Sequence, residues 1–183
     1  MNNNHIIAIT NRKLCQRPFL EVMEDLSKKN FQSIILREKD LSQKEYEELL
    51  EQCIQICGRE KLTVHTYIEA ARKANISRIH LPFPLFLERY KELEDFEVVG
   101  TSIHKVEEGI KAMELGADYV TAGHIFATDC KKGLPPRGLE FLSNVVKEVT
   151  IPVYAIGGIS EKNIQKVIET GAIGGCIMSG CMR

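Results

Sequence analysis

The sequence predicts an α/β protein of the (β/α)₈ TIM-barrel class, and three observations lead to this prediction. Short apolar segments alternate eight times with segments whose apolar residues recur at helical spacing. The apolar segments are continuous, as in residues 6–9 and 153–156, which is typical of parallel strands covered by helices. No low-complexity linker interrupts the 183 residues, so we expect a single domain over residues 1–183.

Eight segments are expected to form the strands of the barrel, and helical segments with a period of 3.6 residues separate them. The expected strands are 5–10, 31–37, 61–65, 77–81, 96–101, 118–123, 151–156 and 173–179. The alternative architecture is an open, doubly wound parallel sheet, which the same alternation of elements also permits.

The clearest expected helix follows Ser42, because Ser42 and Glu45 have the spacing of a capping box. Gly58 is expected to end it. Six apolar residues form one stripe along this helix: Tyr46, Leu49, Leu50, Cys53, Ile54 and Cys57. The two cysteines lie within this stripe, so we expect buried thiols there rather than half of a metal site.

Three further helices are expected from similar stripes, and the flanking residues indicate where they begin and end. Their apolar positions lie in 106–113, closed by Gly116, in 139–149, and in 164–168, with Ser160 as N-cap and Gly171 at the end. The chain ends at Arg183, directly after the eighth expected strand, so the barrel is expected to lack its last helix. Either the chain is truncated, or another chain covers that face, which leaves a homodimer possible.

The composition excludes several classes of partner. A formal net charge of −1 gives no reason to expect nucleic acid or an anionic membrane as a partner. No apolar segment approaches the roughly 20 residues of a membrane span, and the N-terminus lacks a basic region followed by an apolar one. We therefore expect a cytoplasmic protein, in which the six scattered cysteines form no disulfides.

In a barrel of this class, the carboxyl ends of the strands carry the active site. The most informative segment is 123–133, which follows an apolar strand and brings a histidine, two lysines, and hydroxyl and thiol groups to that edge. The other strand ends would deliver further polar groups to the same edge: Thr10, Asn11, Arg37, Glu38, Lys39, His65, Thr66, Thr101, Ser102, Ser179 and Gly180.

Cations and glycines at this edge predict an anionic, phosphorylated substrate. Arg37 and Lys39 flank Glu38, which could pair with either, and Lys131 is expected at the same edge. Gly157 and Gly158 open a turn at a helix N-terminus after the seventh strand, a position at which such barrels commonly bind phosphate. The alternative is a turn that only requires positive φ angles. The predicted substrate- and phosphate-binding residues are Arg37, Lys39, Ser102, Thr128, Cys130, Lys131, Gly157, Gly158, Ser179 and Gly180.

His124 is the candidate catalytic residue, because it ends the sixth strand at the expected active edge. An imidazole can both take up and return a proton near neutral pH. The alternative is a structural histidine whose ring is satisfied by neighbouring groups.

The motifs resemble the thiamine phosphate synthase/TenI superfamily over nearly the whole chain. The residues that carry the resemblance are the segment 123–133, Arg137-Gly138-Leu139, the strand and glycine turn at 151–159, residues 35–39 and residues 99–104. In synthases of this family, Arg37, Lys39, Ser102, Lys131 and the two glycines correspond to residues that hold pyrophosphate and thiazole phosphate. The segment that contains His124 is most similar to TenI-type thiazole tautomerases.

The choice of branch depends on where the sequence departs from the synthases. Synthases carry acidic residues that bind Mg²⁺ after the third and fourth strands, where this chain reads His65-Thr66 and residues 80–85 without an acid. They also have proline in place of His124 and threonine in place of Cys130. The resemblance therefore implies an isomerase of thiamine biosynthesis, a thiazole tautomerase that aromatises a thiazole carboxylate phosphate through a proton shift at His124.

A tautomerase of this kind implies a small-molecule thiazole phosphate as its partner, no cofactor and no metal. Two other functions are kept as alternatives. One is a thiamine phosphate synthase, a transferase that joins pyrimidine pyrophosphate and thiazole phosphate and would use Mg²⁺. The other is a non-catalytic phosphate-ligand-binding or regulatory protein.

Overall fold

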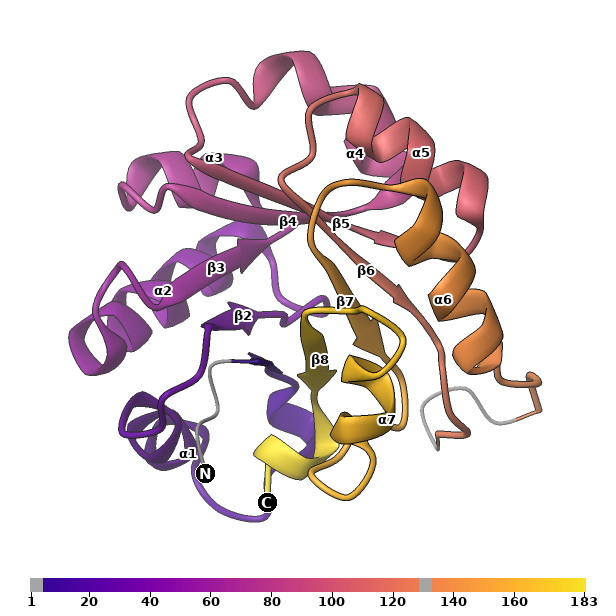
Figure 1. Ribbon diagram of the computed structural model, residues 1–183. Coiled ribbons are helices and arrows are strands. Elements are labelled where there is room, and N and C mark those ends of the chain that lie inside the picture. Colours follow the sequence, from indigo (N-terminus) through magenta and orange to yellow (C-terminus); the bar gives the residue numbers. More distant parts are fainter. Residues whose placement is uncertain (1–4, 129–132) are drawn as a thin grey trace. The chain divides into compact units, whose positions relative to one another are not determined.

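The computed structural model describes residues 5–128 and 133–183, and its eight parallel strands follow one another in sequence order in a closed barrel (Figure 1). The strands are β1 (Ile6–Ile9), β2 (Ser33–Leu36), β3 (Leu62–His65), β4 (Arg78–Pro82), β5 (Val98–Ile103), β6 (Tyr119–Gly123), β7 (Val153–Ile156) and β8 (Gly174–Ile177). The predicted barrel is confirmed, and the open doubly wound sheet was the wrong alternative. Each strand lies within or close to the segment that its apolar residues predicted.

Helices alternate with the strands throughout the described residues. The α-helices are α1 (Phe19–Ser27), α2 (Gln43–Cys57), α3 (Ile68–Lys73), α4 (Phe83–Arg89), α5 (Val106–Glu114), α6 (Gly138–Glu148) and α7 (Ile164–Ile168). Short 3₁₀ turns are η1 (Arg12–Leu14), η2 (Tyr90–Glu92) and η4 (Ser179–Cys181). In the described part of the chain, β8 is followed by η4. None of the described helices is long and apolar enough to cross a membrane.

The contacts between residues divide the chain into two compact units. The first unit comprises Met1–His80, Asp95–Val98 and Met178–Arg183, and the second comprises Leu81–Glu94 and Val99–Ile177. The expectation of a single domain over residues 1–183 stays a prediction.

In the first unit, α1 and α2 pack against each other, and α3 contacts α2. The predicted capping box of α2 is present: the Glu45 N–H donates to Ser42 Oγ at 3.3 Å, and the Ser42 N–H donates to Glu45 Oε2 at 2.8 Å. Tyr46, on the buried stripe of this helix, donates its hydroxyl hydrogen to the Leu36 carbonyl at 2.6 Å. This bond ties α2 to the end of β2.

The thiols of Cys53 and Cys57 are free and buried, as the stripe predicted. Burial raises the pKa of both thiols, that of Cys57 to about 11, because a thiolate loses its hydration there. These groups therefore contribute to the packing of α2 as small apolar residues.

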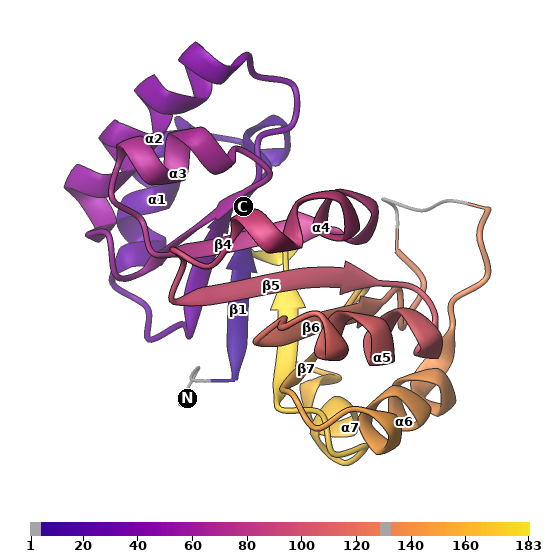
Figure 2. The same cartoon turned by 90° about the horizontal axis from the view of Figure 1, so that it is seen from above.

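In the second unit, helices α5, α6 and α7 lie next to one another on one side of β6 and β7 (Figure 2). Leu142 and Val145 of α6 are fully buried in this layer. The start of α7 differs from the prediction, because Asn163 and not Ser160 is the N-cap residue. A turn intervenes, in which Asn163 Oδ1 accepts the Ser160 N–H at 2.9 Å and Asn163 Nδ2 donates to the Gly158 carbonyl at 2.9 Å.

Candidate functional site

In the first unit, a buried carboxylate holds together the segments that follow β1 and β2. Glu38 is 2% exposed and accepts hydrogen bonds from Thr10 Oγ1 at 2.7 Å, from the Arg12 N–H at 3.0 Å and from Arg12 Nη1 at 3.1 Å. Of the described cations, the one that forms an ion pair with Glu38 at this distance is Arg12, whereas the sequence suggested Arg37 or Lys39. Glu38 therefore supports the edge of the strands.

Arg12 also binds Asp40 with both ends of its guanidinium. Its Nη1 and Nη2 each donate to one oxygen of Asp40 at 2.7 Å, and Lys13 Nζ lies 3.0 Å from the same carboxylate. These hydrogen bonds, from Arg12 first, hold the pKa of Asp40 well below its usual range. Both carboxylates after β2 are thus engaged by cations from the segment after β1.

The two substrate-binding candidates after β2 lie beside this cluster. Arg37 is half-buried and donates its backbone N–H to Thr10 Oγ1 at 2.9 Å, while Lys39 is exposed. Because Thr10 bonds both the Arg37 backbone and the Glu38 carboxylate, its hydroxyl links β1 to the segment that carries both cations.

His65, at the end of β3, and His80, in the middle of β4, form a buried pair that the register of these strands places side by side. Their ring centroids are 5.9 Å apart, with the rings nearly stacked. Burial lowers the pKa of both rings, and the positive charge of Arg37 lowers them further, that of His80 to about 3. His80 itself and Lys39 also lower the pKa of His65. Both imidazoles are therefore neutral near pH 7.

Thr66 completes this group and has an uncommon backbone conformation. Its φ is +74°, a left-handed conformation that β-branched residues rarely adopt and that asparagine and aspartate adopt more readily. Its Oγ1 lies 2.7 Å from His65 Nδ1, and its N–H donates to the His80 carbonyl at 3.1 Å. The hydrogen bonds of Thr66 thus connect both histidines.

In the second unit, two side chains converge on the carbonyl that ends β6. His104 Nδ1 donates to the Gly123 carbonyl at 2.7 Å, and Arg137 Nε donates to the same oxygen at 3.1 Å. The Arg137 backbone N–H also donates to the His124 carbonyl at 2.9 Å, and its guanidinium lies 5.5 Å from the centre of the Phe141 ring. This role of His104 could not be expected from the sequence, because the hydrogen bond depends on the neighbouring ends of β5 and β6.

His124 itself is buried, with 6% of its surface exposed. Its Nε2 lies 3.3 Å from the Leu134 carbonyl, and because a carbonyl only accepts, this nitrogen carries the hydrogen in that contact. The next two residues are bound to the end of β7: the Ile125 N–H donates to the Ile156 carbonyl at 2.9 Å, and the Phe126 N–H donates to the Gly157 carbonyl at 3.0 Å. The segment after β6 is thereby joined to the turn after β7.

Gly157 and Gly158 have a structural reason to be glycine that requires no ligand. Their φ angles are +96° and +66°. A Cβ on Gly157 would lie 2.3 Å from His124 Cβ, and one on Gly158 would lie 2.6 Å from the Ala127 carbonyl oxygen. The expected helix N-terminus directly after this turn was wrong, because α7 begins only at Ile164. The phosphate-binding role of the two glycines stays a prediction.

The remaining predicted residues divide between the units. Ser102, half-buried in β5, accepts a hydrogen bond from Thr121 Oγ1 at 2.9 Å, and Thr128 is half-buried, in the same unit. Ser179 and Gly180 are exposed in η4, which belongs to the first unit. Cys130 and Lys131 lie outside the described residues.

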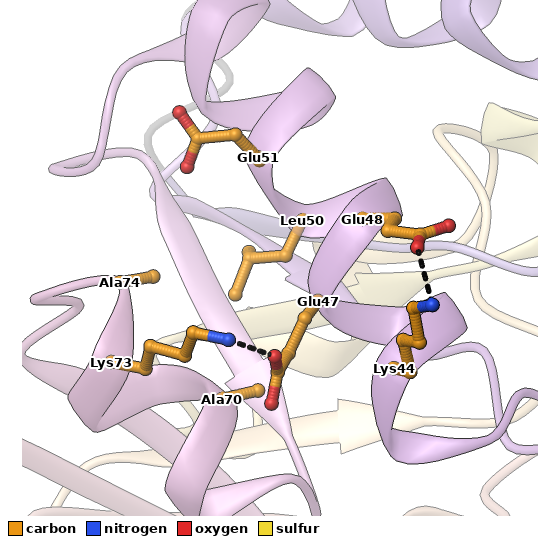
Figure 3. A pocket seen from close by; sticks show the side chains of 8 residues that line it. All are labelled: Lys44, Glu47, Glu48, Leu50, Glu51, Ala70, Lys73 and Ala74. Carbon is orange, nitrogen blue, oxygen red and sulfur yellow. Dashed lines mark hydrogen bonds and ion pairs between the residues drawn. The ribbon is translucent and has the colours of Figure 1, made fainter.

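A surface groove of about 370 Å³ lies between α2 and α3 in the first unit, away from the strand ends (Figure 3). The Lys73 ammonium points toward Glu47 and forms an ion pair with it, and Lys44 Nζ lies 3.9 Å from Glu48 Oε1. The groove is lined by Lys44, Glu47, Glu48, Leu50, Glu51, Ala70, Lys73 and Ala74. None of the residues expected to bind substrate lines it.

The residues after β2 and the histidines of β3 and β4 do not match the preference of Mg²⁺ for carboxylate and other oxygen ligands. Glu38 and Asp40 are engaged by Arg12, and His65 and His80 present ring nitrogens. Among residues 5–128 and 133–183, no three His, Cys, Asp or Glu side chains gather in a way that could hold a metal ion.

A closed parallel barrel with polar side chains at the carboxyl ends of its strands is an architecture typical of enzymes. The family model described as thiamine monophosphate synthase matches residues 6–181, so the chain belongs to this family, and the resemblance inferred from its motifs is confirmed.

The relatives agree with this assignment over nearly the whole chain. The chain is 35% identical over 185 residues to the thiamine-phosphate synthase of Syntrophomonas wolfei, covering 97% of this chain and 88% of that protein. It is 32% identical over 188 residues to the thiamine-phosphate synthase of Clostridium novyi, covering 99% of this chain and 92% of that protein. The solved structure of thiamine phosphate pyrophosphorylase from Pyrococcus furiosus matches with a TM-score of 0.82 at 29% identity, over 100% of this chain and 89% of that chain.

These relatives overturn the tautomerase prediction. They are named as synthases, which are transferases, so the expected isomerase activity was wrong and the alternative is better supported. The proton shift expected of His124 is withdrawn with that activity. The departures after β3, β4 and β6 concern a few residues, whereas the similarity to synthases extends over nearly the whole chain.

Proposed function

We propose that this protein is a thiamine-phosphate synthase, a transferase of thiamine biosynthesis that joins pyrimidine pyrophosphate and thiazole phosphate. The observation that carries the proposal is the 35% identity to a protein of that name over 97% of the chain. The cations and glycines that the family uses for its two phosphorylated ligands are also present in the sequence.

In the proposed reaction, the carbon–oxygen bond between the pyrimidine methylene group and the diphosphate breaks. A carbon–nitrogen bond to the thiazole ring forms, and the diphosphate leaves with the electron pair of the broken bond. Negative charge therefore grows on the diphosphate in the transition state, and cations placed beside it lower the barrier. We assign this task to Arg37 and Lys39, which come from the same segment after β2.

The thiazole phosphate is assigned to residues of the remaining predicted set, by their correspondence with the family. The set comprises Ser102, Thr128, Cys130, Lys131, Gly157, Gly158, Ser179 and Gly180. His124, with its backbone packed against Gly157, is assigned a structural role beside this group. We further propose a cytoplasmic protein that acts on small molecules, without nucleic acid or membrane partners and with a homodimer as a possible assembly.

No step of this reaction is assigned to Mg²⁺, because the donor groups described above do not suit that ion. Charge stabilisation is assigned to side chains of the protein.

The test is a product assay with the purified protein and both substrates, in which thiamine phosphate and inorganic pyrophosphate are measured by chromatography. The parent protein is expected to complete many turnovers. Arg37→Gln is expected to lower kcat by roughly 10²–10³-fold, as for the loss of one group that stabilises transition-state charge. Lys44→Gln, which removes an equal charge from the outer face of α2, is the matched control. Absence of multiple turnovers by the parent protein, with and without added Mg²⁺, would contradict the proposed function.

A further inference from the structure

We propose that the amino ends of β3 and β4 form a binding site for a small anion, at the edge opposite the carboxyl ends of the strands. Thr63 of β3 and Arg78 of β4 hold the anion. The ligand is a halide ion or one oxygen of a small oxyanion such as phosphate. Neither residue belongs to the set assigned to the substrates, so this site is independent of the proposed function.

Two buried polar atoms carry the proposal. Thr63 Oγ1 and Arg78 Nε are both shielded from solvent, and within residues 5–128 and 133–183 they are the buried side-chain nitrogen or oxygen atoms without a hydrogen-bond partner. Thr63 as a whole is 1% exposed, and Arg78 is half-buried. Buried polar groups in folded proteins are nearly always hydrogen-bonded, because an unpaired one loses its hydrogen bonds to water without replacement. These two atoms therefore indicate a bound group that accepts hydrogen bonds.

The two orphaned atoms come from neighbouring positions of the sheet. β3 and β4 pair in parallel with Val64 opposite Ile79. One position earlier on each strand, the same register brings Thr63 opposite Arg78. Successive side chains of a strand alternate between its faces, so Val64 and Ile79 lie on one face and Thr63 and Arg78 share the other. Because neighbouring strands are about 4.8 Å apart, the hydroxyl and the guanidinium can contact a single ligand.

The charge of Arg78 favours an anion as this ligand. A guanidinium is positively charged at any physiological pH. Within the described part of the chain, Arg78 takes part in none of the ion pairs, so no carboxylate compensates its charge. An anion at Nε supplies that compensation and accepts the unused hydrogen bond.

The donor groups favour an anion over a water molecule. Arg78 Nε can only donate, and the Thr63 hydroxyl can donate as well. On the other side of Thr63, the register of β2 and β3 places Ile35, whose apolar side chain offers no acceptor. A water molecule that accepts from both groups needs acceptors for its own two hydrogens, whereas an anion needs donors alone.

Burial and position define the size of the ligand and its effect. Because both atoms are shielded, only a single ligand atom reaches both of them, which restricts the site to a halide ion or one oxygen of an oxyanion. The amino ends of the strands are the face of a TIM barrel at which residues serve stability, whereas the carboxyl ends serve catalysis. We therefore expect the anion to stabilise the folded protein, since it binds a site that the unfolded chain lacks.

The experiment measures the midpoint of thermal unfolding of the full chain by circular dichroism. NaCl, NaBr and sodium phosphate are each raised from about 5 to about 200 mM, a range over which a ligand of the folded state stabilises with the logarithm of its concentration. For a dissociation constant of about 10 mM, the midpoint of the parent protein should rise by about 3–6 °C.

Matched substitutions separate the site from general effects of salt. Thr63→Val keeps the shape of the side chain without its hydroxyl and should lose at least half of the rise, whereas Thr63→Ser keeps the hydroxyl and should retain the rise. Arg78→Gln removes the charge and should abolish the rise. Arg17→Gln removes an equal charge from an exposed arginine that pairs with Asp25, so it is the control and should respond as the parent does.

At the lowest salt concentration, the order of stability gives a second readout. Thr63→Val should then be at least as stable as the parent protein, because valine has no hydroxyl to leave unpaired. At the highest concentration, the parent should be the more stable of the two. A valine variant that is less stable by the same amount at every concentration would contradict the site.

Crystals of the parent protein grown in NaBr or in sodium phosphate show the ligand directly. Anomalous density of bromide, or density of phosphate, is expected within hydrogen-bond distance of Thr63 Oγ1 and Arg78 Nε. Absence of both ions there would overturn the inference, and so would an equal rise of the midpoint in all variants. If Arg78→Gln fails to fold, the comparison of Thr63→Val with Thr63→Ser and the crystal density still decide the question. A rise with halides alone or with phosphate alone supports the site and identifies its ligand.

Discussion

Replacing Gly157 by alanine should destabilise the protein through one identifiable contact. The new Cβ would lie 2.3 Å from His124 Cβ and 2.8 Å from its Cα. Because the latter atom belongs to the backbone, the segment after β6 must shift or the turn after β7 must open. The two segments are also joined by the hydrogen bond from the Phe126 N–H to the Gly157 carbonyl, so the shift strains this bond as well.

The magnitude follows from two contributions. Alanine at a φ of +96° costs about 1–2 kcal/mol relative to glycine, because its Cβ crowds the neighbouring carbonyl. Crowding in a packed region costs about 1–3 kcal/mol more. Gly157→Ala should therefore lower the free energy of unfolding by about 2–5 kcal/mol. Gly116 is the matched control, because its φ is +87° and a Cβ there would meet nothing within 4 Å, so Gly116→Ala carries only the first contribution.

The assay is equilibrium unfolding in urea, followed by circular dichroism, for the parent protein and both alanine variants. Gly157→Ala should be less stable than Gly116→Ala by about 1–3 kcal/mol, the contribution from crowding alone. If the two variants unfold with free energies within about 0.5 kcal/mol of each other, the difference expected between unrelated surface changes, the close approach to His124 has no energetic consequence and the reasoning is wrong.

Three further predictions concern the first unit. The pKa of His80 in the folded protein is lowered to about 3, whereas an unfolded imidazole binds a proton below about pH 6.5, so the free energy of unfolding should fall as the pH is lowered from about 5.5 to 4. His80→Gln should reduce the slope of this pH dependence by about 1.4 kcal/mol per pH unit. The exposed control His5→Gln should leave the slope unchanged, and an unchanged slope in His80→Gln would contradict the cause given. Arg12→Gln, which leaves the buried Glu38 without its ion pair, should lower the free energy of unfolding in urea by about 1.5–3 kcal/mol. A decrease below about 0.5 kcal/mol would show that the ion pair contributes nothing to stability. Ser42→Ala should cost about 1 kcal/mol and shift the thermal midpoint down by about 2–4 °C, whereas an unchanged midpoint would rule out a stabilising cap.

The strands and the main helices could be predicted because their causes are local. A parallel strand covered by helices is typically a continuous apolar run, so a segment such as 6–9 is apparent without its neighbours. The capping box of α2 is likewise a relation between residues three positions apart, and both of its hydrogen bonds are present. The start of α7 was mispredicted because the side chain of Asn163 forms a turn that competes with a cap at Ser160.

The candidate site could be predicted only in part. The residue types at the strand ends were apparent, but their partners were not, because those partners come from distant segments. Arg12 reaches Glu38 across 26 positions of the sequence, and His104 reaches the Gly123 carbonyl across 19. The choice between branches of the family also failed, because a few changed residues were given more weight than similarity over the whole chain.

By itself, the sequence determined the order of strands and helices and the family, and it favoured the barrel over an open sheet, because apolar periodicity and contiguous motifs can be recognised without knowledge of distant contacts. Only the tertiary structure decided that Glu38 pairs with Arg12, that His65 and His80 form a buried neutral pair, and that Gly157 is packed against His124. The physical reason is that strand register and the close approach of backbones set which polar groups meet and how much water they retain, and both depend on chain segments that are remote in sequence.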